Sequence, residues 1–308
     1  MQTVLASLIP VFLLIALGYL LRRMLLPRDD HWLGLEQLVY YVLFPALLIE
    51  TLARANLASV PIAGIGGATL LAVLAMAALC LALQPLLART LALDGPGFSS
   101  VFQGAVRWQT FVALSVAGNM FGEHGLALAS VAMVAMIPVL NVMSVSVLAH
   151  YAAPRRMPWT WTLLAVVRNP LIWACLVGFA INVSHLPVPA PIYDFIGSLG
   201  RCSLAIGLLV VGAGLHLEEL LRPRPATLLT VVLKLVLMPA IAVALGTAFG
   251  LSGSDLAVVA CCASVPSASN GYVLARQMGG DAPLLAQILT WQTALAVITM
   301  PVFIALAA

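Results

Sequence analysis

Ten long apolar runs, separated by short stretches that hold charged residues, glycine or proline, constrain the fold of this chain more than any other feature. They lie near residues 2–21, 35–53, 62–84, 98–120, 125–149, 161–183, 193–216, 226–249, 255–275 and 283–307. About 20 mainly apolar residues suffice to cross the hydrocarbon core of a bilayer as a helix. We therefore predict an all-α polytopic membrane protein with ten transmembrane helices.

The composition excludes several other classes of protein. Of the 308 residues, 63% are hydrophobic and 8% are charged, whereas soluble domains are about one quarter charged. A disordered chain, a nucleic-acid-binding protein and a separate soluble domain are therefore excluded. The five cysteines lie in apolar runs, without a Cys-x-x-Cys pair or a histidine at metal-binding spacing. We expect no disulfide, no metal site and no cofactor.

The basic residues predict the orientation in the membrane. Ten of the fourteen Lys and Arg residues follow the first, third, fifth, seventh or ninth run. Because short cytoplasmic loops retain positive charge, we expect both termini on the non-cytoplasmic side of the cytoplasmic (inner) membrane. Arg107 and Lys234 fall inside apolar runs. Lys234 lies about two turns from the cytoplasmic start of its run, and we expect its side chain to extend to the membrane surface.

The chain consists of a five-helix unit used twice. Residues 154–160 form a linker between 1–153 and 161–308, and each part holds five runs. The Pro-x7-Gly spacing of Pro10–Gly18 recurs in Pro170–Gly178 at an offset of 160. An odd number of crossings gives the two units opposite orientations, and such inverted repeats are typical of secondary transporters with a midplane substrate site. We predict a 5+5 inverted repeat.

The fourth run of each unit is the most polar, which predicts a pair of crossing, interrupted helices. Broken helices expose backbone N–H and C=O groups to a substrate. Pro266 removes a backbone donor and predicts a break in the ninth run. The fourth run has Val106 at the corresponding position, so the sequence leaves open whether that run is broken. The polar residues that correspond at offset 160 are Gln109 with Ser269 and Thr110 with Asn270.

The polar groups at this depth are the candidate substrate-binding residues. A guanidinium inside a span costs at least about 2.5 kcal/mol, and the fork of Arg107 suits a carboxylate. The alternatives for Arg107 are snorkelling and pairing with backbone carbonyls at the crossover. For Asn141 and Gln292, hydrogen bonding between helices is as good an explanation as ligand contact. The full set is Arg107, Gln109, Thr110, Asn141, Pro266, Ser267, Ser269, Asn270 and Gln292.

Short motifs along nearly the whole chain resemble the auxin efflux carrier family, which includes the plant PIN-FORMED carriers and bacterial malate or malonate permeases. The motifs are Tyr41-Val-Leu-Phe-Pro45, Arg107-Trp-Gln-Thr-Phe-Val-Ala-Leu, Ile137-Pro-Val-Leu-Asn141, Arg168-Asn-Pro170, Lys234-Leu-Val-Leu-Met-Pro239, Val265-Pro266, Gly271-Tyr-Val-Leu-Ala275 and Gly279-Gly-Asp281. The resemblance implies a scaffold of the first, second, sixth and seventh helices and a transport unit of the third to fifth and eighth to tenth. It also implies elevator-type movement and a homodimer through the scaffold, which the small residues of Ala205–Gly214 suit.

The leading hypothesis is a secondary transporter that moves a small organic anion, a carboxylate, across the membrane by elevator-type alternating access. An enzyme is disfavoured, because the chain contains neither His-Glu-x-x-His nor Gly-x-Ser-x-Gly. An anion channel or a membrane substrate sensor is the alternative. Acidic and histidine residues lie in loops or near run ends, which disfavours a carboxylate-based proton or sodium site. The expected partners are the anion, the lipid bilayer and a second copy of the chain.

Overall fold

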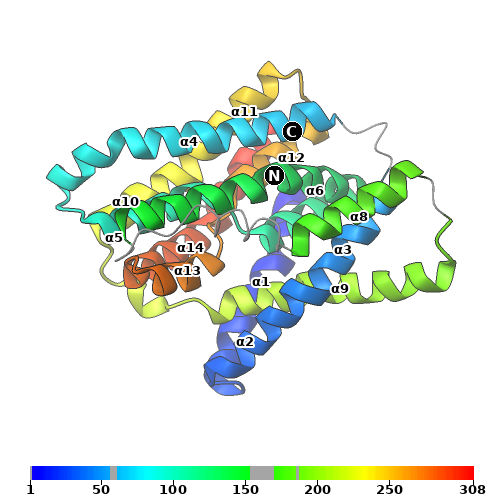
Figure 1. Cartoon of the computed structure of the whole chain (residues 1–308), viewed down its shortest axis with the longest axis horizontal. Coiled ribbons are helices and arrows are strands. Elements are labelled where there is room, and N and C mark those ends of the chain that lie inside the picture. Colours follow the sequence, from blue (N-terminus) through cyan, green and yellow to red (C-terminus); the bar gives the residue numbers. More distant parts are fainter. Residues whose placement is uncertain (1, 56–60, 153–169, 185–186) are drawn as a thin grey trace.

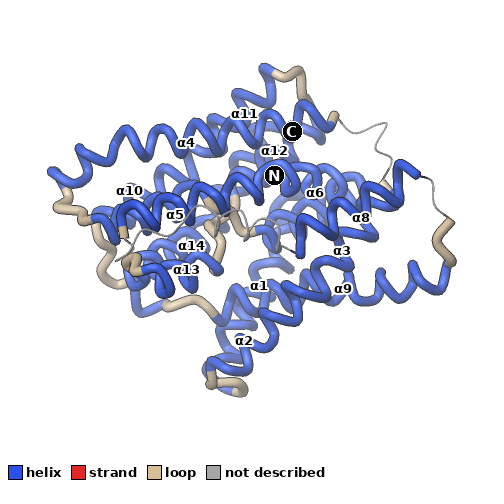
Figure 2. The backbone as a smooth tube through the Cα atoms, viewed as in Figure 1, coloured by secondary structure: helices blue, strands red, loops and turns tan. Residues whose placement is uncertain are grey.

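The computed structural model describes residues 2–55, 61–152, 170–184 and 187–308, which form helices joined by short loops (Figures 1 and 2). The described residues contain no strand. The α-helices are α1 (Gln2–Met24), α2 (Asp29–Leu38), α3 (Phe44–Arg54), α4 (Ile62–Thr90), α5 (Gly95–Val106), α6 (Thr110–Tyr151), α8 (Pro170–Ser184), α9 (Ala190–Ala213), α10 (Pro225–Val232), α11 (Met238–Ala248), α12 (Gly253–Ser264), α13 (Asn270–Met278) and α14 (Ala282–Ala307). Three short elements, η1 (Val39–Leu43), η3 (Leu217–Leu220) and η4 (Leu233–Leu237), lie between them.

Within the described residues, seven helical stretches are long and apolar enough to span a membrane. They are Ala6–Met24, Asp29–Arg54, Ala63–Thr90, Gly95–Tyr151, Ala190–Ala213, Pro225–Ala248 and Ala282–Ala307. α8 and α12 are shorter apolar helices. The chain is thus an all-helical polytopic membrane protein, while the count of ten spans and the 5+5 inverted repeat stay predictions. The linker 154–160 and the start of the sixth predicted run lie outside the described residues.

The long stretch Gly95–Tyr151 holds the fourth and fifth predicted runs and is interrupted twice. Arg107, Trp108 and Gln109 are non-helical and separate α5 from α6. Within α6, Gly122 has φ 59° and ψ −145° and divides the helix at a kink. Such a backbone conformation is open to glycine and strained for other residues. This kink lies between the predicted runs 98–120 and 125–149.

Two spans carry a π-helical turn directly before a proline. η1 joins α2 to α3 ahead of Pro45, and η4 joins α10 to α11 ahead of Pro239. Proline has no N–H to donate to the preceding turn, and a π turn absorbs the mismatch in the hydrogen-bond ladder while leaving the helix continuous. Tyr40 and Lys234 lie inside these two turns.

The helices pack in two groups that meet along α6. One group is α1, α3, α8 and α9, and the other is α4, α5, α10, α11, α12 and α14 (Figure 1). Two glycines allow α9 to pack closely on α1 and α6. A Cβ on Gly212 would overlap the Ile15 carbonyl, and a Cβ on Gly207 would press on Phe111. These two glycines of the Ala205–Gly214 segment are therefore occupied by contacts within the chain. The homodimer through the scaffold stays a prediction.

Candidate functional site

Two helix breaks cross each other in the interior of the protein. In the first, α5 ends at Val106 and Arg107 is extended, with φ −70° and ψ 158°. In the second, residues 265–269 separate α12 from α13. The Gln109 N–H donates to the Pro266 carbonyl oxygen over 2.8 Å, which joins the two breaks. The fourth run is thus broken although it lacks a proline.

Polar side chains reinforce the crossing. Arg107 Nη2 donates to Asn270 Oδ1 over 2.9 Å, and Gln109 Nε2 donates to Ser269 Oγ over 3.1 Å. Gln109 and Ser269 are 160 residues apart, which is the offset at which the two halves of the sequence correspond. Two residues that the predicted repeat pairs are therefore hydrogen-bonded to each other.

A cavity of about 460 Å³ opens beside the crossing, and an adjoining cavity of about 70 Å³ shares much of its wall. Six of the nine candidate residues line these cavities: Arg107, Gln109, Thr110, Asn141, Ser269 and Asn270. The opposite wall comes from η1, α3, α8 and α9 and includes Phe44, Leu171 and Val210. The larger cavity therefore lies between helices of the first group and the two helix breaks with the helices that follow them, α6 and α13.

The electrostatics of this cavity favour an anion. Arg107 is only 6% exposed, so its guanidinium does not reach the membrane surface, and its Nη1 has no hydrogen-bond partner among the described residues. α6 begins at Thr110 and α13 at Asn270, so two helix N-termini lie on the cavity wall. Helix N-termini carry free N–H groups and partial positive charge. A fixed cation and two positive helix ends thus meet at one place.

The other three candidates lie behind the cavity wall. Pro266, Ser267 and Gln292 do not line either cavity. Gln292 Oε1 accepts a hydrogen bond from the Ser267 N–H, and Gln292 Nε2 donates to the Gly104 carbonyl, each over 2.9 Å. Ser267 Oγ donates to the Gln103 carbonyl over 3.0 Å. These groups hold the two broken helices together from the far side.

Several residues on the cavity wall were not singled out from the sequence. They are aromatic or amphipathic: Glu36, Tyr40, Tyr41, Phe44 and Phe111. Their apolar neighbours made them indistinguishable from ordinary lipid-facing or core residues. The π turn before Pro45 is the local signal that could have directed attention to Tyr40. Among the described residues, no group of three or more His, Cys, Asp or Glu side chains is placed to hold a metal ion.

The prediction that Lys234 extends to the membrane surface is wrong. Its side chain is fully buried, and its Nζ has no hydrogen-bond partner among the described residues. The residue lies in the π turn η4, which is enclosed by α5, α10, α11, α12 and α14. Neighbouring helices therefore cover the lysine stem before it can reach the headgroup region.

Apolar spans, two crossing helix breaks and a polar cavity at the crossing together define a polytopic membrane transporter. The family model described as "Membrane transport protein" matches residues 3–304. The chain belongs to this family, and the match confirms the resemblance to the auxin efflux carriers. An "Uncharacterized transporter" from Methanothermobacter thermautotrophicus is 24% identical over 303 residues, which cover 96% of each chain.

Proposed function

We propose that this protein is a secondary carrier for a small organic anion that bears a carboxylate. The observation that carries the proposal is the buried Arg107, which lies on the cavity beside the N-termini of α6 and α13 and whose Nη1 has no partner in the described part of the chain. A carboxylate accepts hydrogen bonds from a guanidinium in a two-point geometry. Asn270 accepts a hydrogen bond from Nη2, and Nη1 keeps its donor capacity for a ligand.

The cavity favours a monocarboxylate with an apolar body over a dicarboxylate. Among the described residues, Arg107 is the single Lys or Arg on the cavity wall, and the other ionisable groups there are Glu36 and two tyrosines. A second carboxylate on the substrate would have no second cation among the described residues to pair with, and it would meet the carboxyl group of Glu36. Phe44 and Phe111, whose ring centroids lie 4.9 Å apart, offer an apolar surface for the rest of the molecule.

The two groups of helices support an elevator-type movement. The group α1, α3, α8 and α9 corresponds to the scaffold that the resemblance implies, and the two breaks follow α5 and α12 of the other group. A cavity between a fixed and a moving part is the geometry that alternating access requires. Because the resemblance implies a homodimer, we extend the proposal to a dimer that forms through the scaffold. We also propose that the protein lies in the cytoplasmic (inner) membrane with both termini on the non-cytoplasmic side, as the distribution of basic residues predicts.

The test is counterflow of radiolabelled anions in proteoliposomes, comparing an aromatic monocarboxylate with malate and malonate. We expect saturable counterflow of the monocarboxylate, a weaker signal for the dicarboxylates, and loss of counterflow in Arg107→Gln. Arg201→Gln is the matched control, because Arg201 is an exposed arginine that does not line the cavity. Equal transport by both variants would place the substrate elsewhere.

The same liposomes distinguish the alternatives. An anion channel would give single-channel currents, and its anion flux would not saturate when a labelled counter-anion is present inside the liposomes. A membrane substrate sensor would bind the monocarboxylate but move none of it. Either result, obtained with well-folded protein, would overturn the carrier proposal.

A further inference from the structure

Lys234 is the single lysine of the chain and a charge-bearing group that the proposed anion site does not use. Its side chain is completely buried, and its Nζ lacks a hydrogen-bond partner among the described residues. Moving an ammonium ion out of water costs several kcal/mol even after the protein relaxes, unless the ion is paired. A buried amine without a partner therefore calls for an explanation beyond packing.

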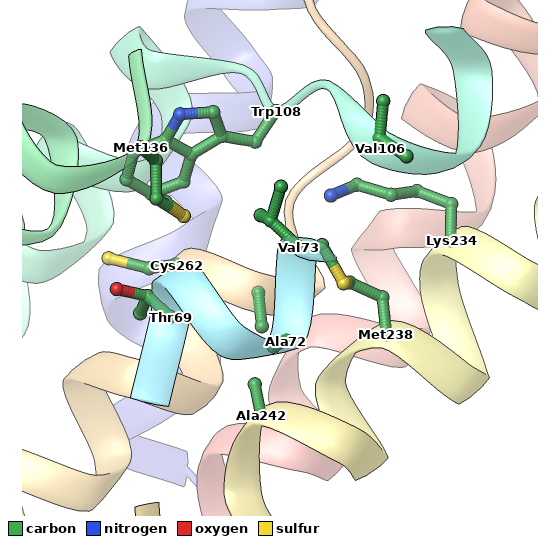
Figure 3. Close-up of a pocket in the computed structure, with 11 residues that line it drawn as sticks. Thr69, Ala72, Val73, Val106, Trp108, Met136, Lys234, Met238, Ala242 and Cys262 are labelled. Atoms are coloured by element: carbon green, nitrogen blue, oxygen red, sulfur yellow. The ribbon is translucent and has the colours of Figure 1, made fainter. Parts of the chain in front are cut away.

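The amine borders a small void on the far side of the crossing. The void measures about 10 Å³, which is about the space of one water molecule. Figure 3 shows the Lys234 amine directed into it from η4, with Val106, Trp108 and Cys262 around it. The remaining walls come from α4, α6 and α11 and are apolar except for Thr69. The amine is therefore enclosed but within reach of a single water.

No fixed negative charge of the described residues faces this amine. The elements packed against η4 are α5, α10, α11, α12 and α14, and of these only α12 carries titratable side chains, namely Asp255, Cys261 and Cys262. Asp255 is paired with His124 over 3.1 Å. The void is also lined from α4, whose titratable residues are Cys80 and Arg89, and from α6, whose titratable residues are Glu123, His124, His150 and Tyr151. Only Cys262 among all of these lines the void.

Backbone dipoles nevertheless favour a positive charge at this position. Val106 is the last residue of α5, and Cys262 and Ala263 lie in the last turn of α12. Helix C-termini carry carbonyl groups without intrahelical partners and partial negative charge. The two helix breaks therefore place two helix N-termini on the wall of the anion cavity and two helix C-termini beside the lysine. An amine placed there can hold a proton although no carboxylate is present.

The lysine is also connected to the anion cavity. Trp108 lines the void beside Lys234 and lines the smaller cavity together with Arg107 and Asn270. One non-helical segment of three residues, 107–109, therefore borders both places. An anion bound at Arg107 adds a negative potential that stabilises an ammonium nearby, and a lysine amine, unlike a guanidinium, can adopt either charge state inside a protein.

We propose that Lys234 is a proton-binding site that couples anion transport to a proton gradient. The lone pair of the amine bonds a proton, delivered through the water-sized void, as the anion binds, and this N–H bond breaks when the anion leaves. Anion and proton then move together, and a monoanion moved with one proton carries no net charge. The inference rests on the proposed anion site at Arg107.

The first test compares driving forces in proteoliposomes. With the wild type, we expect a pH gradient of one unit to drive about tenfold accumulation of the monocarboxylate, and an imposed potential to have no effect. With Lys234→Met, which keeps the length of the side chain and removes the amine, we expect accumulation to follow the potential and to ignore the pH gradient. Thr69→Val is the control, since it changes another polar wall of the same void without changing charge.

The second test uses the fact that the chain has one lysine. Labelling with lysine that carries ¹⁵N at Nζ, in protein with a lysine-free tag, gives a single side-chain amine signal. We expect this signal to report a mixture of amine and ammonium, with a larger ammonium fraction at fixed pH after the monocarboxylate is added. This measurement needs no variant, so it decides the matter even if Lys234→Met fails to fold.

The outcomes separate the two proposals. Absence of counterflow in the wild type overturns the carrier proposal. Counterflow with no response to a pH gradient, or an amine signal that is unchanged by pH and by the anion, overturns the role of Lys234 and leaves the carrier proposal standing.

Discussion

Replacing Gln292 tests whether the crossing of the broken helices is held from behind the cavity. The Gln292 amide is fully buried and bonds the Ser267 N–H and the Gly104 carbonyl. α5 ends at Val106, so Gly104 lies in its last turn, where carbonyls lack intrahelical partners. Gln292→Leu keeps the volume approximately and leaves both backbone groups without a partner. The substitution therefore removes the clamp with little change in packing.

The expected loss of stability follows from these two groups. A buried unsatisfied group costs about 1–3 kcal/mol, whereas hydrogen bonds between membrane helices are worth about 0.6 kcal/mol on average and up to about 1.7. Taking about 1–2 kcal/mol for each group, we expect the free energy of unfolding to fall by about 2–4 kcal/mol. The measurement is unfolding by sodium dodecyl sulfate in mixed micelles, followed by tryptophan fluorescence.

Thr293→Val is the matched control in the same helix. The Thr293 hydroxyl donates to the Leu289 carbonyl of its own α14, so its loss leaves no backbone group unpaired, and we expect a change below about 1 kcal/mol. If Gln292→Leu and Thr293→Val have the same free energy of unfolding, the hydrogen bonds of Gln292 do not stabilise the crossing. If it keeps its stability but loses anion binding, Gln292 contacts the substrate and the position of the cavity is wrong.

Two further predictions concern the anion site and the packing of α1 on α9. Asn270→Asp should place a carboxylate against the Arg107 guanidinium, now 2.9 Å from the Asn270 oxygen, and lower anion affinity in a binding assay at least about tenfold, more than Asn270→Ser does. Gly212→Ala should lower the free energy of unfolding by about 1–3 kcal/mol, because its methyl group would overlap the Ile15 carbonyl. Gly34→Ala, with no atom within 4 Å of the added carbon, should be neutral or slightly stabilising in the same assay.

The sequence predicted those features that arise from local composition. The apolar runs predicted a helical membrane protein, and Pro266 predicted the second break. The first break has no such local cause, because Arg107 to Gln109 contain no proline or glycine and the extended backbone is held by the Pro266 carbonyl of the other half. The correspondence at offset 160 anticipated which residues share this depth, and the contact of Gln109 with Ser269 agrees with it.

The buried position of Lys234 could not be predicted from local composition. The expectation of snorkelling used only the distance along the helix from the predicted membrane surface. Whether a lysine stem reaches that surface depends on the helices that surround it, and here five elements pack around η4. The π turn also changes the direction in which residues of the span point, and a regular period of 3.6 residues does not reveal it. The place of Tyr40 on the cavity wall was not predicted for the same reason, because Tyr40 lies in the π turn η1.

One structural event accounts for both charged groups inside the membrane. When two helices break at the same depth and cross, their N-terminal halves end in carbonyls and their C-terminal halves begin with N–H groups, so opposite partial charges face opposite sides of the crossing. Arg107 adds a permanent positive charge on the side that is already positive, and the proposed anion would neutralise this charge while it is bound. Lys234 lies on the side that is negative, where an amine can accept a proton. A Lys234→Arg variant would make that second charge permanent, and we expect it to bind the monocarboxylate at every pH but to lose transport driven by a pH gradient.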